Sequence, residues 1–570
     1  MRKNLLSTVA MFAVAAAVSG PVAADDSHGN GPDFGRHDND GHHGSRQDEA
    51  RTVTPIKHLV VIFNENRSFD HYFATYPKAT NPPGEPVFKA ARNTPAVNNL
   101  AANAYVLLSH NANSINPNNV DAKGNFIGTN PFRLDRTQAN TASQNHSYAP
   151  EQQAYDNGAA DLFPKFTGRG TSGGAGAFGT AGQVMGYFDG NTVTGLWNYA
   201  QHFAMSDNAY TDTYGPSTPG ALNVISGQNN GAKNVVGNSS SIADGQGGLS
   251  LIGDTDPGYD VCSSTSSTVT MAGKNIGDLL NNANLTWGSF MGGFNLQTTN
   301  ANGTTGCKRS TFGTVVNGNV TDYSPHHAWF QYYVQTANPT HARPNSIAAV
   351  GYTKHDGQVD PANHGYDLQD FYDAVKAGNY PSVAYIKMSA YQDGHAGNSD
   401  PLDEQAGNVE LINFLQKQPD WENTAVIITY DDSDGWYDHA YATPTQASYD
   451  AAADQVNGAG KCGTGTQPNG LNGKPVNGRC GPGTRIPFIV ISPFAKQNYV
   501  SHERISQASV VRFIEDNWLD GRRLGGGSLD ASAGSINDMF DFGHGHRNDE
   551  LFLDPSTGTE MPDRGHGHDH

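Results

Sequence analysis

Four short apolar runs place the strongest constraint on how this chain can fold. They are HLVVIF at 58–63, SVAYIKM at 382–388, AVIITY at 425–430 and IPFIVISPF at 486–494. Apolar, β-branched runs of this length predict strands that are covered on both faces. Segments with helical apolar spacing alternate with them, at 182–203, 368–378, 405–418 and 506–518. This alternation predicts an α/β fold with a central, mostly parallel sheet and helices on both faces.

The start of the chain is typical of a signal peptide. Arg2 and Lys3 precede an apolar run at 5–20 that ends in small residues, and cleavage after Ala24 is expected. A membrane anchor is the alternative, but a span needs about 20 apolar residues. We therefore expect residues 1–24 to direct export to the periplasm or the medium.

The rest of the chain divides by composition. Residues 25–51 and 541–570 are polar and rich in Gly and His, which predicts solvated tails, with metal scavenging as the less favoured alternative. Residues 52–540 are expected to form the folded domain. Apolar runs are scarce near 229–323, so a loop-rich insertion or cap is expected there.

Charge and cysteine content limit the partners and the compartment. Lys and Arg number 35 against 55 Asp and Glu, a net charge of −20, which argues against binding to nucleic acid or anionic membranes. No second apolar run is long enough for a membrane span, and nothing indicates an oligomeric state. Cys262, Cys307, Cys462 and Cys480 form an even set, which predicts disulfides in an exported protein. Three pairings are possible, Cys262–Cys307 with Cys462–Cys480 being the local one; zinc is disfavoured because no CxxC pair occurs.

Two of the predicted strands end in acidic residues. Glu65 and Asn66 follow the first, and Asp431 and Asp432 follow the third. Ligands of open α/β sheets bind at the carboxyl ends of strands, so these side chains are expected to meet. Carboxylates that lie close repel one another unless a cation neutralises them. The oxygen donors predict one divalent metal ion such as Mg²⁺, Ca²⁺ or Mn²⁺, although any single acid could instead be a strand-end cap.

Ser217 lies in the turn YGPSTPG, just before Pro219, where a helix is expected to begin. The Ser217 hydroxyl could cap this helix, which is the common role of a serine at such a position. Because a helix start favours an anion, the hydroxyl could instead act as a nucleophile beside the metal. Histidines in polar loops, His146, the pair 326–327 and His395, could be structural. Near a metal they would instead donate to phosphoryl oxygens or act as general acids.

Five segments in this order carry a family resemblance. HLVVIFNENRSFDHYF, YGPSTPGALNVISGQ, SPHHAWFQYY, DGHAGNSDP and ITYDDSDGWYDH resemble the acid phosphatase/phospholipase C superfamily of bacterial phosphoesterases, from about 56 to 518. The resemblance implies an alkaline-phosphatase-like core and a phosphoryl-enzyme mechanism. It assigns Glu65, Asn66, Asp431 and Asp432 to the metal, Ser217 as nucleophile and further ligand, and His146, His327 and His395 to the phosphoryl oxygens. His327 is preferred to His326 because the family histidine lies two residues before a position often filled by Pro, here Trp329.

The nucleophile turn also bears on the branch of the superfamily. Phospholipases commonly have T-D-P-N-R where this chain has Ser-Thr-Pro-Gly-Ala at 217–221, and the larger ones carry further C-terminal domains. We therefore expect a broad-specificity acid phosphomonoesterase that acts on small phosphate esters, with histidines protonated below about pH 6.5. A C-type phospholipase that hydrolyses phosphatidylcholine and a non-catalytic exported metal- or phosphate-binding protein are the alternatives.

Overall fold

The computed structural model describes residues 51–171, 177–543 and 550–562. The expected signal peptide and nearly all of the N-terminal tail lie outside the described residues. The expected C-terminal tail is described in part, and that part packs. Leu551 and Leu553 are buried, and their backbone N–H groups donate to the side chains of Gln416 and Asn413. The expectation that residues 541–570 are wholly a solvated tail is therefore wrong, because the apolar run at 551–553 docks on a helix.

An eight-stranded sheet forms the core, and the predicted α/β class is confirmed. In spatial order its strands are β16 (Gly365–Asp367), β11 (Trp287–Met291), β17 (Val383–Lys387), β1 (His58–Asn64), β18 (Thr424–Tyr430), β19 (Phe488–Ile491), β4 (Ala204–Ser206) and β20 (Tyr499–Ser501). All four predicted strands are present, as β1, β17, β18 and β19. The pairings are parallel except that β19 runs antiparallel to both of its neighbours.

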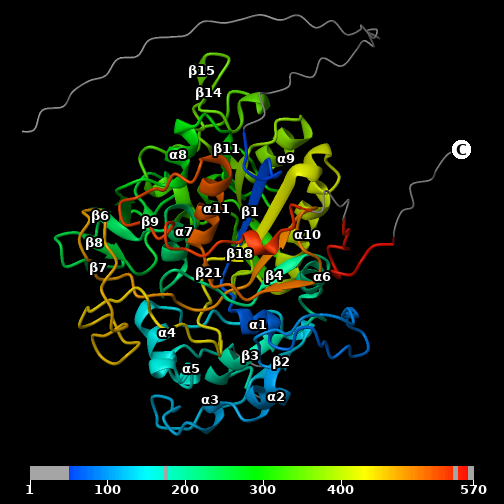
Figure 1. Ribbon diagram of the computed structural model, residues 1–570, viewed down its shortest axis with the longest axis vertical. Helices are drawn as coiled ribbons and strands as arrows, with labels where there is room; N and C mark the ends of the chain where they lie inside the picture. The colour runs from blue at the N-terminus through cyan, green and yellow to red at the C-terminus, as the bar shows by residue number, and fades with distance from the viewer. Residues whose placement is uncertain (1–50, 172–176, 544–549, 563–570) are drawn as a thin grey trace, which may run out of the picture. The chain divides into compact units, whose positions relative to one another are not determined.

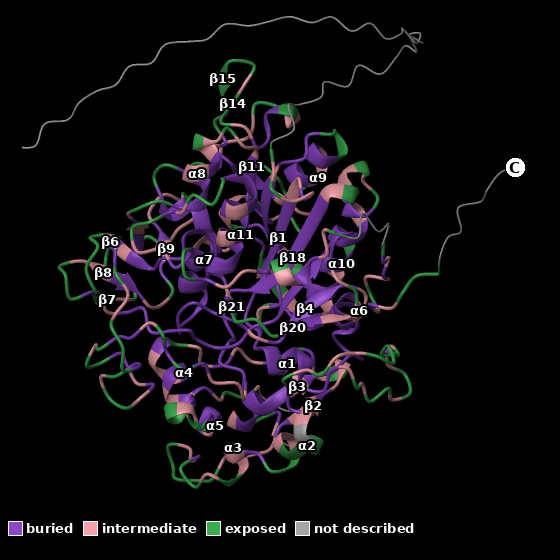
Figure 2. Ribbon diagram, in the orientation of Figure 1, coloured by how far each residue is buried: buried purple, intermediate pink, exposed green. Residues whose placement is uncertain are grey.

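The pairing of β1 with β18 sets the position of everything that follows them. The register joins Leu59 to Ala425 and Asn64 to Tyr430. The next residues of both strands, Glu65 and Asp431, therefore leave the sheet side by side. Figure 2 shows both strands in the buried colour, as expected for strands covered on both faces.

The main helices cover the sheet. They are α6 (Thr194–His202), α7 (Ser217–Ser226), α8 (Ile276–Asn282), α9 (Leu368–Lys376), α10 (Pro401–Leu415) and α11 (Ala508–Trp518). Figure 1 shows α7 beside α11 on one side of the sheet and α6 beside α10 on the other. The segment 182–203, expected to be helical throughout, is divided into the 3₁₀ helix η3 (Ala181–Met185), β3 (Gly186–Phe188) and α6. The break falls at Gly190, where a Cβ would lie 2.3 Å from the Trp197 ring.

The segment expected as an insertion contains a second sheet. Its strands are β6 (Asn230–Val236), β7 (Ser241–Ala243), β8 (Leu249–Leu251), β9 (Asp256–Pro257) and β10 (Thr268–Met271), in the order β7-β8-β6-β10-β9. The expected range of 229–323 needs a correction, because β11 inside it belongs to the central sheet. Its sequence, WGSFM, is too short and too weakly β-branched to stand out as a core strand. The hairpin β12 (Ser310–Gly313) and β13 (Gly318–Thr321) follows it.

A further layer, not expected from the sequence, lies at the carboxyl end of β1. It contains α1 (Phe69–Phe73), α2 (Ala102–Ser109), α3 (Ala112–Ile115), β2 (Phe132–Leu134), α4 (Tyr148–Ala154) and α5 (Phe163–Phe166). Figure 1 shows these elements grouped around α1 together with β3. We call residues 102–188 the cap, because they cover the sheet edge at which ligands of α/β proteins bind.

Three short strand pairs complete the described strands, the first being the parallel pair of β2 with β3. The hairpin β14 (Lys354–His355) with β15 (Gln358–Val359) is exposed, whereas β5 (Ala209–Tyr210) pairs with β21 (Ile505–Ser506). Within the described ranges, no helix combines the length and the apolar character needed to cross a bilayer.

Candidate active site

The end of β1 presents only two side chains to the carboxyl edge of the sheet. Glu65 is buried, and Asn66 adopts a left-handed backbone with φ of 61° that turns the chain sharply. The neighbouring polar residues are used elsewhere. Asn64 donates to Glu404 at 3.0 Å, and the Ser68 hydroxyl accepts the His71 N–H to cap α1. Glu65 and Asn66 are therefore the residues of this polar stretch whose side chains lie at the carboxyl edge of the sheet, where a ligand could bind.

Arg67 and Asp70, two charged residues that follow Asn66, have partners other than each other in the described structure. Asp70 contacts Arg485 at 3.1 Å and the His439 ring at 2.6 Å. Arg67 is buried against the Tyr72 ring and donates to the Gly394 carbonyl. It therefore anchors the loop that carries His395.

The end of β18 brings two carboxylates to the same place. Asp431 Oδ1 accepts the backbone N–H of Asn66 at 2.8 Å and that of Asp432 at 2.7 Å. Asp432 Oδ1 accepts the N–H of Asp434 at 2.5 Å. Burial and the charge of Asp432 raise the pKa of Asp431 well above its ordinary value. Burial likewise raises the pKa of Asp432, although the charge of His146 opposes it.

Ser217 joins this pair of strand ends. It is the first residue of α7, two positions before the predicted start at Pro219, and its side chain caps no helix N–H. Its Oγ lies 3.3 Å from Glu65 Oε2 and 3.2 Å from Asp432 Oδ2, where it can donate. The structure therefore directs this hydroxyl at the carboxylates from both strands and not back at its own helix.

Gly220 makes the approach of α7 possible. A Cβ at this position would lie 2.0 Å from the Asp431 carbonyl oxygen and 2.9 Å from Gln507 Nε2. Ala221, the next residue, is buried. The Gly-Ala pair, which stands where phospholipases commonly have Asn-Arg, therefore faces the protein interior. It sets how close the helix start comes to β18.

We expect Gly220→Ala to damage both stability and activity. The added methyl would force α7 away from the Asp431 backbone, at a cost of about 1–3 kcal/mol or more in the free energy of unfolding. Ser217 would move with the helix. Gly465→Ala is the matched control, because nothing lies within 4 Å of a Cβ there. Denaturant unfolding and phosphatase assays check this, and wild-type behaviour of both variants would show that the contact is unimportant.

The donors at these strand ends fit a divalent cation. Asn66 Oδ1 and Asp431 Oδ2 are buried with no hydrogen-bond partner among the described residues. Ligand atoms of Glu65, His327 and Asp431 lie within 4.8 Å of one another. Carboxylate and amide oxygens suit a hard cation, which would also remove the repulsion between the buried acids. Together with Asp432 and Ser217, these residues supply the oxygen-rich donor set of such a site.

Lys387 is a buried cation that the sequence reading missed. Its Nζ lies 2.9 Å from Glu65 Oε1 and 2.6 Å from Asp393 Oδ2. Burial opposes its charge, but Asp393 and Glu65 raise its pKa. The only signal in the sequence is a lysine at the end of the apolar run SVAYIKM. The lysine fixes the orientation of Glu65 and offsets part of the negative charge.

The three candidate histidines come from three different loops. His327 Nδ1 lies 2.9 Å from Glu65 Oε1, whereas His326 points toward Asp256, at 3.8 Å. His146 Nδ1 lies 3.0 Å from Asp434 Oδ1. The His395 ring lies 6.4 Å from the His146 ring, and its Nδ1 contacts the Ala396 carbonyl at 2.8 Å.

The histidines differ in their affinity for a proton. Burial lowers the pKa of His327 to about 3, despite the opposing charge of Glu65. Burial also disfavours the charged form of His146, but the charges of Asp432 and Asp434 raise its pKa well above the ordinary value. The expectation that acid pH keeps all three rings charged is therefore wrong for His327, which is neutral at mildly acid pH.

Two further acids hold the cap against the site, and the sequence reading assigned them no role. Asp434 Oδ1 accepts from Asn66 Nδ2 and Ser143 Oγ, both at 2.9 Å, which ties the His146 loop to the strand ends. Glu151, in α4, accepts the Gly215 N–H at 2.9 Å and the Ser433 hydroxyl at 2.7 Å. It thus links the cap to the nucleophile turn.

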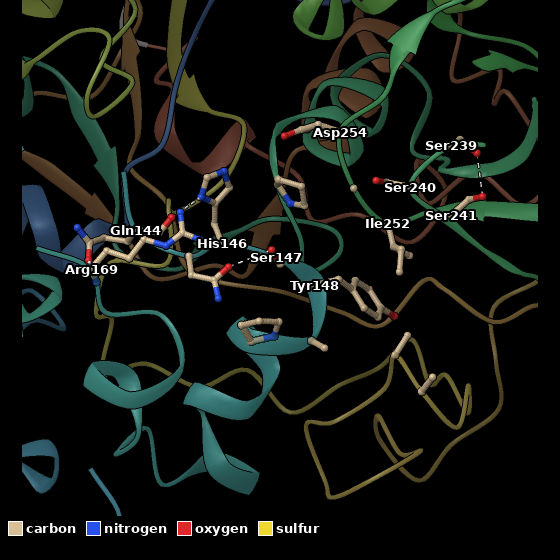
Figure 3. A pocket seen from close by; sticks show the side chains of 17 residues that line it. Gln144, His146, Ser147, Tyr148, Arg169, Ser239, Ser240, Ser241, Ile252 and Asp254 are labelled. Atoms are coloured by element: carbon tan, nitrogen blue, oxygen red, sulfur yellow. Dashed lines mark hydrogen bonds between the residues drawn. The ribbon is translucent and has the colours of Figure 1, made fainter. Parts of the chain in front are cut away.

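A cavity of about 630 Å³ adjoins this group of residues. It meets the site at His146 and at Pro216, the residue before Ser217. Figure 3 shows Gln144, His146 and Arg169 from the cap along one wall. The opposite wall carries side chains of the second sheet, at 239–241 and 252–254.

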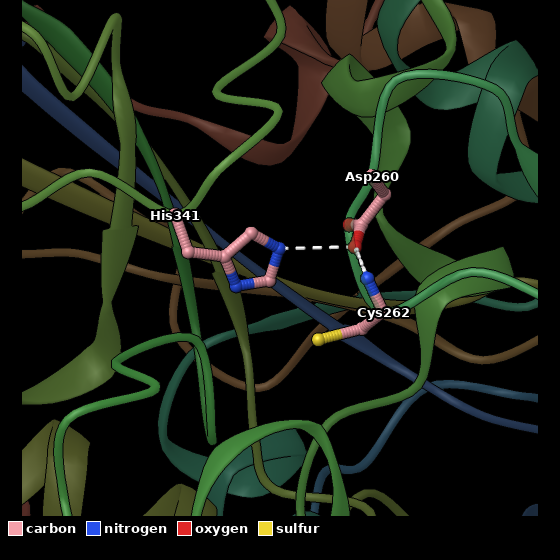
Figure 4. A group of neighbouring side chains, drawn as sticks. All are labelled: Asp260, Cys262 and His341. Atoms are coloured by element: carbon pink, nitrogen blue, oxygen red, sulfur yellow. Dashed lines mark hydrogen bonds and ion pairs between the residues drawn. The ribbon is translucent and has the colours of Figure 1, made fainter.

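Another acid–histidine group, Asp260, Cys262 and His341, is structural (Figure 4). Asp260 Oδ1 lies 3.0 Å from His341 Nε2 and accepts the Cys262 N–H at 2.7 Å. The sulfur is not available as a ligand, because Cys262 is bonded to Cys307. Cys462 is bonded to Cys480, so the predicted disulfides are confirmed, and of the three pairings that the sequence left open the local one is present.

The chain is similar to known proteins over most of its length. The model of the phosphoesterase family matches residues 56–519. A non-hemolytic phospholipase C of Burkholderia pseudomallei is 24% identical over 82% of this chain, and phospholipase C A of Mycobacterium tuberculosis is 24% identical over 81%. The chain spans only 56% of the length of the first and 72% of the second.

Solved structures overlap this one only weakly. A protein in the alkaline phosphatase superfamily from Vibrio parahaemolyticus aligns with 69% of this chain and 72% of its own, at 11% identity and a TM-score of 0.26. Murine ectonucleotide pyrophosphatase/phosphodiesterase 5 aligns with 61% of this chain and 95% of its own, at 10% identity and a TM-score of 0.29. The family match is therefore the firmer guide to the relatives of this chain, and the strand order of the central sheet is the firmer guide to its fold class.

Proposed function

Because the chain belongs to the phosphoesterase family, we propose that it is an exported, metal-dependent phosphoesterase with Ser217 as its nucleophile. The observation that carries this proposal is the position of Ser217 Oγ, 3.3 Å from Glu65 and 3.2 Å from Asp432, at the carboxyl edge of the sheet. Glu65, Asn66, Ser217, Asp431 and Asp432 would hold one divalent ion. When bound, that ion would lower the pKa of the serine hydroxyl and polarise a phosphoryl oxygen.

The protein's own residues account for the remaining steps. Ser217 Oγ loses its proton and forms a bond to phosphorus as the bond from phosphorus to the ester oxygen breaks. The leaving alkoxide takes up one proton, so the proton that the serine releases and the one that the alcohol gains balance. His146, His327 and His395 provide N–H groups for the phosphoryl oxygens. Lys387 keeps Glu65 oriented and ionised. Water then hydrolyses the phosphoserine and restores the hydroxyl.

For the substrate class, we propose a broad-specificity acid phosphomonoesterase. A choline reader needs aromatic rings around the quaternary amine. Of the described residues that line the cavity beside His146, Tyr148 alone is aromatic, and its hydroxyl donates to Asp454 at 2.9 Å. A C-type phospholipase is the second candidate, favoured by the relatives named above. The two disulfides support export to an oxidising compartment.

Substrate choice can be measured directly. We expect the protein to hydrolyse p-nitrophenyl phosphate with an acidic optimum, and p-nitrophenylphosphorylcholine and phosphatidylcholine weakly or not at all. The reason is that the described residues lining the cavity form no aromatic cage. Release of phosphorylcholine at a rate equal to monoester hydrolysis would move the protein to the phospholipase branch. Binding of metal or phosphate with no turnover of any ester would instead make it a binding protein.

A further inference from the structure

The cavity beside His146 is built by two segments outside the central sheet. One wall comes from the cap, at 144–150 and 169, and the other from the second sheet, at 239–241 and 252–254. Neither segment supplies the proposed nucleophile or a proposed metal ligand. The cavity is therefore placed to contact the part of an ester that lies beyond the phosphoryl group.

Hydroxyl groups dominate the wall from the second sheet. Ser239 and Ser241 bond to each other through their Oγ atoms at 2.8 Å, which fixes both side chains. Ser240 lies between them in the sequence, with its backbone N–H on Thr255 Oγ1 at 2.8 Å. Its own hydroxyl has no partner among the described residues, so it can donate to or accept from a ligand.

Charged groups of both signs frame the same cavity. Asp254 Oδ1 accepts the backbone N–H of Thr218 at 2.9 Å and the Thr218 hydroxyl at 3.1 Å. The Asp254 carboxylate therefore contacts Thr218, the residue that follows Ser217. The second carboxylate oxygen of Asp254, Oδ2, has no hydrogen-bond partner among the described residues. On the opposite wall the Arg169 guanidinium is likewise without a side-chain partner in the described ranges, while its backbone N–H donates to Gln144 at 2.7 Å.

We infer that this cavity binds the leaving alcohol of the ester, and that the alcohol is a compact polyhydroxylated one, such as a sugar or polyol. The inference rests on the proposed phosphoesterase function. The Ser240 hydroxyl, the Asp254 carboxylate and the Arg169 guanidinium offer hydrogen-bond donors and acceptors that match those of neighbouring hydroxyl groups on a sugar or polyol. An apolar leaving group would cover these polar groups without giving them hydrogen-bond partners, which would cost free energy of binding. The volume of about 630 Å³ is ample for a sugar.

The test compares glucose 6-phosphate with p-nitrophenyl phosphate, whose leaving group has no hydroxyl besides the one released. We measure kcat/KM for both with Ser240→Ala and Arg169→Gln. Each variant removes a partner of the sugar, so the ratio of the two values should fall about 2- to 10-fold, the loss expected for one hydrogen bond. Ser266→Ala, which removes an exposed hydroxyl of a loop outside the cavity, should leave the ratio unchanged.

The outcomes separate this inference from the proposed function. If the wild-type protein hydrolyses neither ester, the proposed function fails. If it hydrolyses both, but the cavity variants change the two rates equally or not at all, the leaving-group inference alone is overturned. A higher rate on dioctanoylphosphatidylcholine than on glucose 6-phosphate, insensitive to these variants, would also overturn it.

Discussion

Ser217→Ala is expected to abolish phosphate-ester turnover while the fold stays intact. The variant loses the proposed nucleophile, so kcat should fall by at least roughly 1,000-fold. The structural cost is small, because the Ser217 hydroxyl caps no helix N–H. It makes buried contacts to Glu65 and Asp432, whose loss should cost about 0.5–1.5 kcal/mol of unfolding free energy.

Ser226→Ala serves as the control for this experiment. Ser226 is buried in the same helix, α7, and its hydroxyl donates to the Leu222 carbonyl at 2.7 Å. The control should lose comparable stability but keep its activity. Rapid acid quenching of the wild-type protein with a ³²P-labelled ester should trap a phosphoserine in the peptide that contains Ser217. Near-normal turnover by Ser217→Ala, or label on another residue, would exclude the mechanism.

Asp432→Ala should reduce metal content and activity together. The carboxylate lies at the end of β18, faces Ser217 and has no cation among its side-chain partners in the described structure apart from the nearby charge of His146. Removing it takes away one anionic ligand, and we expect at least a roughly 100-fold loss of metal affinity. Elemental analysis after dialysis, together with phosphatase assays, measures both effects. A variant with a full complement of tightly bound metal would place the ion elsewhere.

An isosteric pair refines the metal experiment. Asp432→Asn keeps the shape of the side chain but removes its charge, so metal should bind more weakly than in the wild-type protein. Asp356→Asn makes the same change at a side chain that is 89% exposed and lies in the turn between β14 and β15. That control should retain metal and activity. Equal losses of metal and activity in both variants would show that the net charge of the protein, and not ligation by Asp432, controls metal binding.

The sequence predicted the parts of the fold that depend on local pattern. The β-branched runs at 58–63 and 425–430 are nearly continuous apolar sequences, the pattern typical of strands that are covered on both faces. Both runs form such strands. The acids that follow them were expected to meet, since parallel neighbours end at one edge. β11 escaped notice because WGSFM has neither alternation nor β-branched residues, and its place is fixed by pairing with β16 and β17.

What the sequence did not reveal depends on contacts between distant segments. Nothing near Lys387 indicates that it lies against Glu65, because that contact exists only once β17 and β1 are paired. Asp434 was visible as an acid, but its role in holding the His146 loop requires the cap to be folded. The sequence does not reveal the constraint at Gly220 for the same reason. Its constraint comes from the Asp431 backbone, which is remote in the chain.

The pairing of β1 with β18 has a consequence for the order in which the enzyme matures. These central neighbours lie far apart in the sequence, and the Asn66 N–H reaches Asp431 across a separation of 365 residues. Contacts of such long range close a large loop and are slow to form. A nascent chain that has not yet reached Asp431 lacks two of the five proposed metal ligands and has no partner strand on that side of β1. If the proposed metal site exists, metal capture would therefore have to wait for synthesis of the chain through Asp432 and for the pairing of β1 with β18, and bound metal would report that this pairing has formed.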